Sequence, residues 1–340
     1  MKIVALLWVF FCTTAIASDW QVGSRIQIFH NEERQLVSRI YYPTSSHEKR
    51  QKISNNPVFV SSEAQLNAPP AAGPFPLVIL SHGSGGNKES LSWLAYALVQ
   101  RGIIVIATDH PGSTTGNSVP AQSIRLWEQT RDISALLDDV LVDPTWQPRI
   151  SSQAIGVIGH SKGGYTAIAL LGGRVSLRDF SAGCQQQPDS PNCIFYKGVH
   201  LEQVPATKFD ADYRDNRIQF AVALDPGMVP YLQPSSLKTL SAPLLIVAVQ
   251  HYIPGNQGAN LQGNMLAAYQ GKYPIIATQL AGANHFDFLP LCKPTATALL
   301  AEEGEAYICG SLMAQRQKIH HQTIKHILKF IAPWLKHARA

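Results

Sequence analysis

Short apolar runs alternate with amphipathic stretches over most of the chain. The apolar runs, typical of buried parallel strands, cover residues 77–80, 103–106, 154–158, 220–224, 244–249 and 275–280. Between or after them, apolar residues recur at helical spacing over 91–99, 133–141 and 324–335. Strands that alternate with helices predict βαβ crossovers, and therefore a mostly parallel sheet with helices on both faces. Ligands of such sheets bind at the carboxyl ends of the strands.

The region before residue 76 has a different pattern. Two β-rich stretches, 25–29 and 36–42, flank a polar turn and predict an N-terminal antiparallel hairpin. Residues 43–75 are rich in Ser, Asn and Pro and predict a loop. The pattern thus predicts an α/β fold in which an antiparallel hairpin precedes the parallel sheet.

The first seventeen residues, 1–17, have the features of a signal peptide. Lys2 gives a positive start, 3–12 is an apolar run, and Ala15-Ile16-Ala17 is a small-residue cleavage pattern. The run is short for a spanning helix of about 20 residues, although an uncleaved N-terminal anchor is the alternative. No later stretch is apolar enough to span a bilayer. We therefore expect a periplasmic or secreted protein with one domain over 18–340.

The cysteine count agrees with export. Apart from Cys12 in the signal region, the chain has four cysteines, an even number that suggests two disulfides in an oxidising compartment. The sequence-local pairing, Cys184 with Cys193 and Cys292 with Cys309, is favoured over the two other pairings and over four free thiols.

The overall composition excludes two classes of protein. A hydrophobic content of 45% excludes wholesale disorder. The 28 Lys and Arg against 23 Asp and Glu form no basic cluster that would indicate nucleic acid.

The strongest chemical signal is a G-x-S-x-G motif, Gly159-His160-Ser161-Lys162-Gly163, between a predicted strand and a predicted helix. This is the context in which a serine nucleophile occupies a tight turn, where small neighbours let the backbone approach itself. A glycine-rich turn with an incidental serine is the alternative. The setting favours Ser161 as a nucleophile.

A serine nucleophile needs a base and an orienting acid, which follow it along the chain as Asp or Glu and then His. Asp225 comes directly after the run 220–224, and no Asp or Glu occurs between Pro226 and Asn284. His285 follows the run 275–280 through a small-residue loop. We therefore expect Asp225 as the acid and His285 as the base. His251 is the rival base, and Asp287 is the rival acid.

Two backbone amides are candidates for the oxyanion hole, the donors that stabilise negative charge in the transition state. Lys162 follows the nucleophile, and Ser84 lies in the glycine-rich loop Ser81–Gly86 after the first parallel strand. The Lys162 side chain is expected near the pocket rim, where an ammonium would favour anionic substrates unless a carboxylate such as Asp109 neutralises it. The alternative places it in solvent or beside a surface acid.

Further histidines fall at the same sheet edge. His82, His110, His160 and His251 are candidates for the pocket wall. Together with carboxylates they could bind zinc, but the chain has no His-Glu-x-x-His or paired-cysteine spacing, so we expect no metal and no other cofactor. Three histidines of the last predicted helix are expected to be solvated: His320, His321 and His326.

These motifs resemble those of the α/β-hydrolases. The resemblance rests on Ser81–Gly86, Asp109-His110-Pro111-Gly112, Gly159–Gly164, Ala223-Leu224-Asp225 and Ala283-Asn284-His285-Phe286. It points to the group that spans platelet-activating-factor acetylhydrolases and secreted dienelactone-hydrolase-like proteins, over nearly the whole mature chain. Dienelactone hydrolases proper use a cysteine nucleophile, whereas this chain has Ser161, and family members commonly have an apolar residue where this chain has Lys162.

The expected function is hydrolysis of carboxylic esters through an acyl-enzyme, with a small-molecule or lipid ester as substrate. An amidase or peptidase with the same triad is the alternative enzyme. A non-catalytic binding protein on the same scaffold is an alternative of another class.

Overall fold

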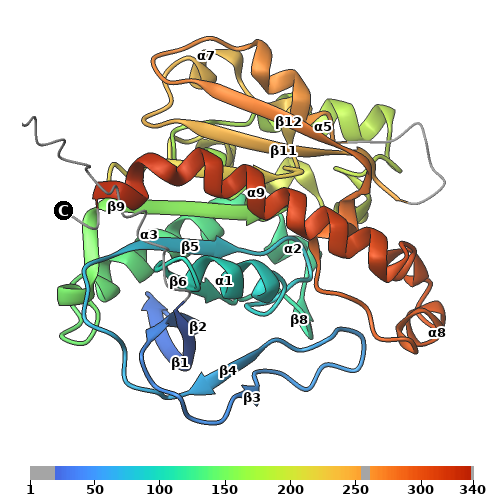
Figure 1. The fold of residues 1–340 in the computed structure, drawn as a ribbon. Helices are drawn as coiled ribbons and strands as arrows, with labels where there is room; N and C mark the ends of the chain where they lie inside the picture. Colours follow the sequence, from blue (N-terminus) through green and yellow to red (C-terminus); the bar gives the residue numbers. More distant parts are fainter. Residues whose placement is uncertain (1–19, 254–260, 338–340) are drawn as a thin grey trace, which may run out of the picture.

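The computed structural model describes residues 20–253 and 261–337 (Figure 1). The expected signal peptide, 1–17, lies outside the described residues. Among the described helices, none has the length and apolar character needed to cross a bilayer.

A ten-stranded mixed sheet forms the centre of the molecule, in the order β12-β11-β10-β9-β5-β6-β2-β1-β4-β3. The six strands from β12 to β6 run parallel, and β2 pairs antiparallel with both β6 and β1. The strands are β1 (Gln21–Asn31), β2 (Arg34–Thr44), β3 (Gln51–Lys52), β4 (Glu63–Leu66), β5 (Phe75–Ser81), β6 (Ile104–Thr108), β9 (Ile150–His160), β10 (Phe220–Leu224), β11 (Leu244–His251) and β12 (Ile275–Asn284). A separate two-residue pair is β7 (Ser113–Thr114) and β8 (Asn117–Ser118). The predicted parallel sheet and N-terminal hairpin are therefore confirmed.

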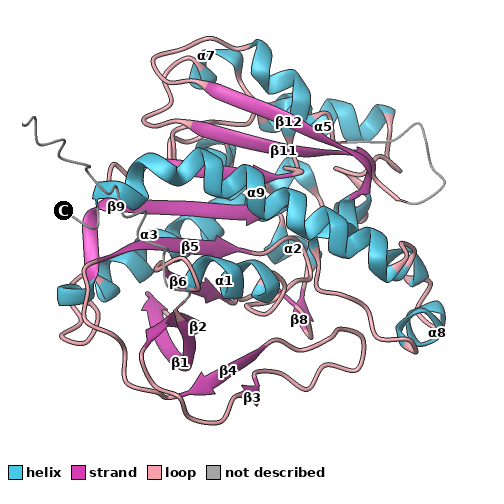
Figure 2. Cartoon of the chain, in the orientation of Figure 1, coloured by secondary structure: helices cyan, strands magenta, loops and turns pink. Residues whose placement is uncertain are grey.

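Helices cover both faces of this sheet (Figure 2). The larger ones are α1 (Ser92–Val99), α3 (Leu126–Val140), α4 (Lys162–Ala169), α5 (Leu177–Gln186) and α9 (Met313–His337). The short ones are α2 (Pro120–Ser123), α6 (Ala206–Phe209), α7 (Pro234–Leu237) and α8 (Ala296–Ala301). Successive residues of β5 point to opposite faces: Leu77 and Ile79 pack with α3 and α4, whereas Val78 and Leu80 pack with α1 and α9. Burial on both faces explains why the parallel strands read as continuous apolar runs.

Two parts of the sheet were not predicted. The segment 43–75 was expected to be a loop, but it contains β3 and β4, and β4 pairs with β1 at the edge of the sheet. Its residues Glu63-Ala-Gln-Leu have no β-branched side chain, so the strand depends on the available edge of β1 rather than on its own propensity. Residues 281–284 were also expected to form a loop, but they belong to β12.

Both expected disulfides are present. Cys184 is bonded to Cys193 and Cys292 to Cys309, with Cα atoms 5.4 and 6.0 Å apart. His320, in contrast, is not solvated as predicted. It is buried on α9, stacks on Trp93 with ring centroids 3.7 Å apart, and lies within 3.0 Å of two backbone carbonyls.

The buried carboxylate of Asp132 on α3 joins the hairpin to the parallel sheet. It accepts hydrogen bonds from Asn31 and Arg34 of the hairpin and from His110 Nδ1 after β6, at 2.7 to 2.9 Å. Burial acts to raise the pKa of Asp132, but the hydrogen bonds from Arg34 and His110 outweigh it and hold the pKa at about 2.

We predict that Asp132→Ala lowers the free energy of unfolding by about 3–5 kcal/mol, because it leaves the buried Asn31 and His110 side chains and the partly buried Arg34 guanidinium without the carboxylate that they bind. Urea unfolding at pH 7 measures the change. The control is Asp138→Ala, which removes a carboxylate that pairs with Arg217 on the surface and is 70% exposed; it should cost less than about 1 kcal/mol. Equal losses in the two variants would contradict this role of Asp132.

Candidate active site

Ser161 occupies a sharp turn between β9 and α4. Its backbone has φ of 58° and ψ of −120°, a conformation that non-glycine residues rarely adopt. A Cβ added to Gly159 would overlap the carbonyl of Gly163, and one added to Gly163 would overlap the carbonyl of Ser81. The glycines of the motif are therefore required by close backbone approach, and the serine is presented at the N-terminus of α4.

The turn is bonded to the next strand. The Ser161 N–H donates to the Leu224 carbonyl at 3.0 Å, and the Ser161 carbonyl accepts from the Gly227 N–H at 2.9 Å. Asp225 lies between these two contacts, directly after β10. These backbone bonds fix the separation of Ser161 and Asp225.

Asp225 and His285 form a buried pair. His285 Nδ1 lies 2.6 Å from Asp225 Oδ2, and both side chains are almost fully buried. The other carboxylate oxygen accepts from the Val249 N–H at 3.4 Å, and the His285 N–H donates to the Tyr252 carbonyl at 3.2 Å. Burial disfavours charge, raising the pKa of Asp225 and lowering that of His285. Burial thus favours the neutral form of the His285 imidazole.

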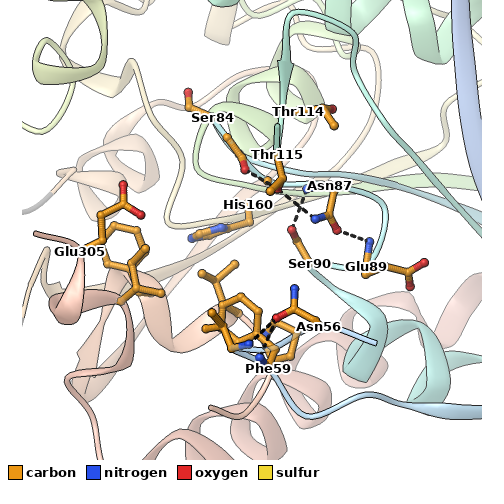
Figure 3. A pocket seen from close by; sticks show the side chains of 18 of the residues that line it. Asn56, Phe59, Ser84, Asn87, Glu89, Ser90, Thr114, Thr115, His160 and Glu305 are labelled. Atoms are coloured by element: carbon orange, nitrogen blue, oxygen red, sulfur yellow. Dashed lines mark hydrogen bonds between the residues drawn. The ribbon is translucent and has the colours of Figure 1, made fainter. Parts of the chain in front are cut away.

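Ser161 and His285 line the same cavity, which has a volume of about 830 Å³. The Ser161 hydroxyl has no hydrogen-bond partner within the described residues, so it faces this space unpaired. A Cβ built on Gly83 would lie 3.4 Å from Ser161 Oγ, which shows that the Gly83 backbone packs directly against the serine. His160 lies in the middle of the lining, between Ser84 on one side and Phe59 on the other (Figure 3).

The two amides expected to form an oxyanion hole lack an intramolecular acceptor within the described residues. In the part of the chain that the structure describes, the N–H groups of Ser84 and Lys162 have no acceptor. By contrast, the Gly85 and Gly86 N–H groups donate to backbone carbonyls at 3.0 and 3.1 Å. Of the two residues, Ser84 lines the cavity, whereas Lys162 is buried behind Ser161.

Comparisons with known proteins identify the fold. A family model described as serine aminopeptidase, S33, matches residues 72–180, which contain Ser161 but neither Asp225 nor His285. A ferulic acid esterase from Streptomyces cinnamoneus has a similar structure, with a TM-score of 0.60 and 17% identity over 96% of this chain and 92% of that chain. The chain has the α/β-hydrolase fold. A dienelactone hydrolase from Anabaena variabilis gives a TM-score of 0.47 and 15% identity over 86% of this chain and 99% of that chain. No curated protein sequence matches the chain.

The other histidines at this edge of the α/β-hydrolase sheet are mostly structural. Only His160 lines the cavity, and its Nε2 donates to the His285 carbonyl at 3.0 Å. The expectation that His82, His110 and His251 line the pocket is wrong. His82 Nδ1 donates to the Gly83 carbonyl at 2.7 Å, and His110 is wholly buried beside Asp132. His251 ends β11, where it pairs in register with Asn284, and it is not among the lining residues. No metal-binding group of His, Cys, Asp or Glu occurs among the residues described.

The Lys162 side chain was expected at the rim or in solvent, and neither expectation holds. It is buried, and its Nζ donates to the carbonyl and hydroxyl of Ser123, at 3.0 and 2.9 Å, and to the Ser113 hydroxyl. Asp109 instead pairs with Lys88 at 2.8 Å. Because Lys162 does not face the cavity, it gives no reason to expect anionic substrates.

Arg316 on α9 makes a buried ion pair near the loop of His285 that the sequence did not reveal. It is almost fully buried and pairs with Asp287, the rival acid, at 3.4 Å. Asp287 also accepts from the Asn284 N–H at 2.9 Å, so it caps the 3-10 turn His285–Phe288 instead of contacting His285 Nδ1. A single arginine within a mostly polar helix carries no signal in a sequence.

We predict a pH-dependent contribution of Lys162 to stability. Burial lowers the pKa of Lys162 to about 7 in the folded protein, whereas an unfolded lysine has a pKa of about 10.4. Between these values the unfolded chain binds a proton that the folded protein does not, so stability rises with pH. Lys162→Met should remove this rise.

Chemical unfolding at pH 6 and pH 9 measures the effect. From pH 6 to pH 9, the free energy of unfolding should increase more for wild type than for Lys162→Met. Lys197→Met, at a lysine whose side chain is 56% exposed, is the control and should follow wild type. If the free energy of unfolding changes with pH by the same amount in wild type and in Lys162→Met, burial does not lower the pKa of the Lys162 amine.

Proposed function

We propose that this protein is a serine hydrolase that cleaves carboxylic esters through an acyl-enzyme. The observation that carries the proposal is the His285–Asp225 hydrogen bond of 2.6 Å, with His285 lining the same cavity as Ser161. A buried neutral imidazole with an acid on Nδ1 has the tautomer that a general base needs, with Nε2 free to accept a proton.

In the proposed mechanism, His285 Nε2 takes the proton of Ser161 as Oγ attacks the ester carbonyl carbon. Asp225 holds the imidazole and stabilises the imidazolium. The amides of Ser84 and Lys162 donate to the oxyanion. His285 then protonates the leaving alcohol and activates a water molecule that hydrolyses the acyl-enzyme. We propose no cofactor for this reaction.

A peptidase of the aminopeptidase type is the second candidate. It is favoured by the description of the matching family model and by two carboxylates in the cavity lining, Glu303 and Glu305. Among the described residues neither carboxylate has a cationic partner, so they could bind the amino group of a peptide. Comparison of a nitrophenyl ester with an aminoacyl anilide separates the two functions.

We also propose that the protein is exported, with residues 1–17 as its signal peptide and 18–340 as one domain. The two disulfides support this location, because disulfides persist in oxidising compartments.

We predict that Ser161→Ala and His285→Ala each lower turnover of nitrophenyl acetate by about 10⁴–10⁶-fold, and that the double variant is little worse, because the groups act as a unit. Asp225→Asn should cost about 10⁴-fold by favouring the wrong tautomer. Steady-state kinetics on purified protein measure these changes.

His251→Gln is the control, because His251 lies outside the cavity, and it should retain wild-type activity. A fluorophosphonate probe should label wild type and His251→Gln but not Ser161→Ala. Loss of activity in His251→Gln with retention in His285→Gln would overturn the assignment of the base.

A further inference from the structure

One wall of the cavity is apolar and comes from two segments far apart in the sequence. Residues 57–60 contribute Pro, Val, Phe and Val, and the region from Phe286 to Ile308 contributes most of the other apolar side chains. The rest of the lining, around Ser84, Asn87 and Thr115, is polar (Figure 3). The lining of the cavity therefore combines apolar and polar parts, and it includes Ser161 and His285.

Backbone contacts join the two segments. Phe59 and Cys292 form an antiparallel bridge, flanked by hydrogen bonds from Val60 N–H to the Leu291 carbonyl at 2.7 Å and from Lys293 N–H to the Val58 carbonyl at 2.8 Å. In Figure 1 the chain between β3 and β4 extends toward the side of the molecule where α8 lies. The loop expected from the sequence thus forms part of the cavity.

The apolar wall has its own small core. Ala296, Leu300 and Cys309 are buried together, with Val58, Phe59, Cys292 and Ile308 packed against them, and this cluster is separate from the two cores that flank the sheet. The Cys292–Cys309 disulfide crosses the cluster, and Arg316 donates to the carbonyls of Pro290 and Ile308. The disulfide, the Arg316 hydrogen bonds and a few packed side chains hold this wall in place, and the main sheet does not.

The polar contacts of His285 lie outside the wall. His285 is held by Asp225, by the Tyr252 carbonyl and by the His160 side chain. Among the described residues, the wall reaches His285 only through the ring of Phe286, 5.1 Å from the His285 ring, and through Arg316, which pairs with Asp287 in the following turn. Loosening the wall should therefore change which substrates bind well and leave the chemistry intact.

The composition of the wall indicates what it binds. A cavity of about 830 Å³ accommodates a sizeable group, and burial of apolar surface favours an alkyl chain or ring. Glu303 and Glu305 also line the cavity, and an anionic group there would meet like charge. We propose that the wall formed by residues 57–60 and the disulfide-closed segment Cys292–Cys309 selects esters that carry a bulky apolar group and no negative charge. The inference rests on the proposed function, because it names a substrate class for the same site.

The test compares two disulfides of the same chain. Cys292→Ser with Cys309→Ser opens the wall, and Cys184→Ser with Cys193→Ser is the matched control, because the second disulfide lies outside the small core of the wall. In the first double variant kcat/KM for nitrophenyl octanoate should fall about tenfold or more, while that for nitrophenyl acetate should change less than about threefold. The control should not change the ratio of the two values.

Phe59→Ala keeps the disulfide and provides a second variant if the cysteine variant does not fold. It should lower kcat/KM for the octanoate selectively, and wild type should prefer octanoate to the mono-nitrophenyl ester of suberic acid, a chain of the same length that ends in a carboxylate. Equal losses on octanoate and acetate, an unchanged octanoate value, or equal use of the suberate ester would each overturn the proposal.

A binding measurement separates this proposal from the proposed function. Calorimetry of nitrophenyl octanoate with Ser161→Ala protein, with and without Phe59→Ala, does not depend on turnover. If wild type hydrolyses no ester but Phe59→Ala weakens binding about tenfold, the wall is supported and the esterase function is wrong. Binding that is unaffected by Phe59→Ala overturns the wall.

Discussion

Close backbone approach at the carboxyl ends of β5, β9 and β10 is the constraint on which the site depends. Gly163 lies against the Ser81 carbonyl, and Gly164 lies against Pro226, so three loops meet without intervening side chains. The Ser161 N–H also donates to the Leu224 carbonyl. Because these contacts are between backbones, the turn that carries the serine, the loop that offers the Ser84 amide and the residue after β10 have little freedom to move apart. A side chain at Gly163 would break this arrangement at its centre.

Buried polar groups hold the surrounding loops in place. Lys162 Nζ binds Ser123 and Ser113, and Ser113 in turn accepts from the Gly85 N–H, so the lysine supports the loop of Ser84 from behind. Arg316 has the equivalent role beneath the loop of His285. Burying such charges is costly unless each finds partners. The resulting hydrogen-bond networks fix the positions of these loops, which apolar packing alone would not fix.

The parallel sheet could be predicted because its strands are buried on both faces and therefore read as apolar runs. Ser161, Asp225 and His285 could be placed together because each follows such a run, and the carboxyl ends of parallel strands share one edge. The edge strand β4 could not be predicted, because its stability comes from pairing with β1.

Side-chain orientation was the main source of error. The environments of Lys162, His82 and His320 depend on partners distant in the sequence, and a pattern of spacing does not show whether a polar side chain faces a cavity or the interior. The same reason explains why Arg316 and the contribution of Phe59 to the cavity were not predicted. Features that depend on a local motif could be predicted from the sequence, whereas the environment of a side chain that depends on tertiary neighbours could not.

The central claim is that Ser161 forms a covalent acyl intermediate. Mixing the protein with nitrophenyl acetate, quenching with acid within the first turnovers and mapping the peptides by mass spectrometry tests it directly. The account predicts an acetyl group on the peptide that contains Ser161, located on that serine and absent from His285→Ala protein treated in the same way. Rapid hydrolysis with no adduct on Ser161, or an adduct on a different residue that turns over at the rate of catalysis, would contradict it.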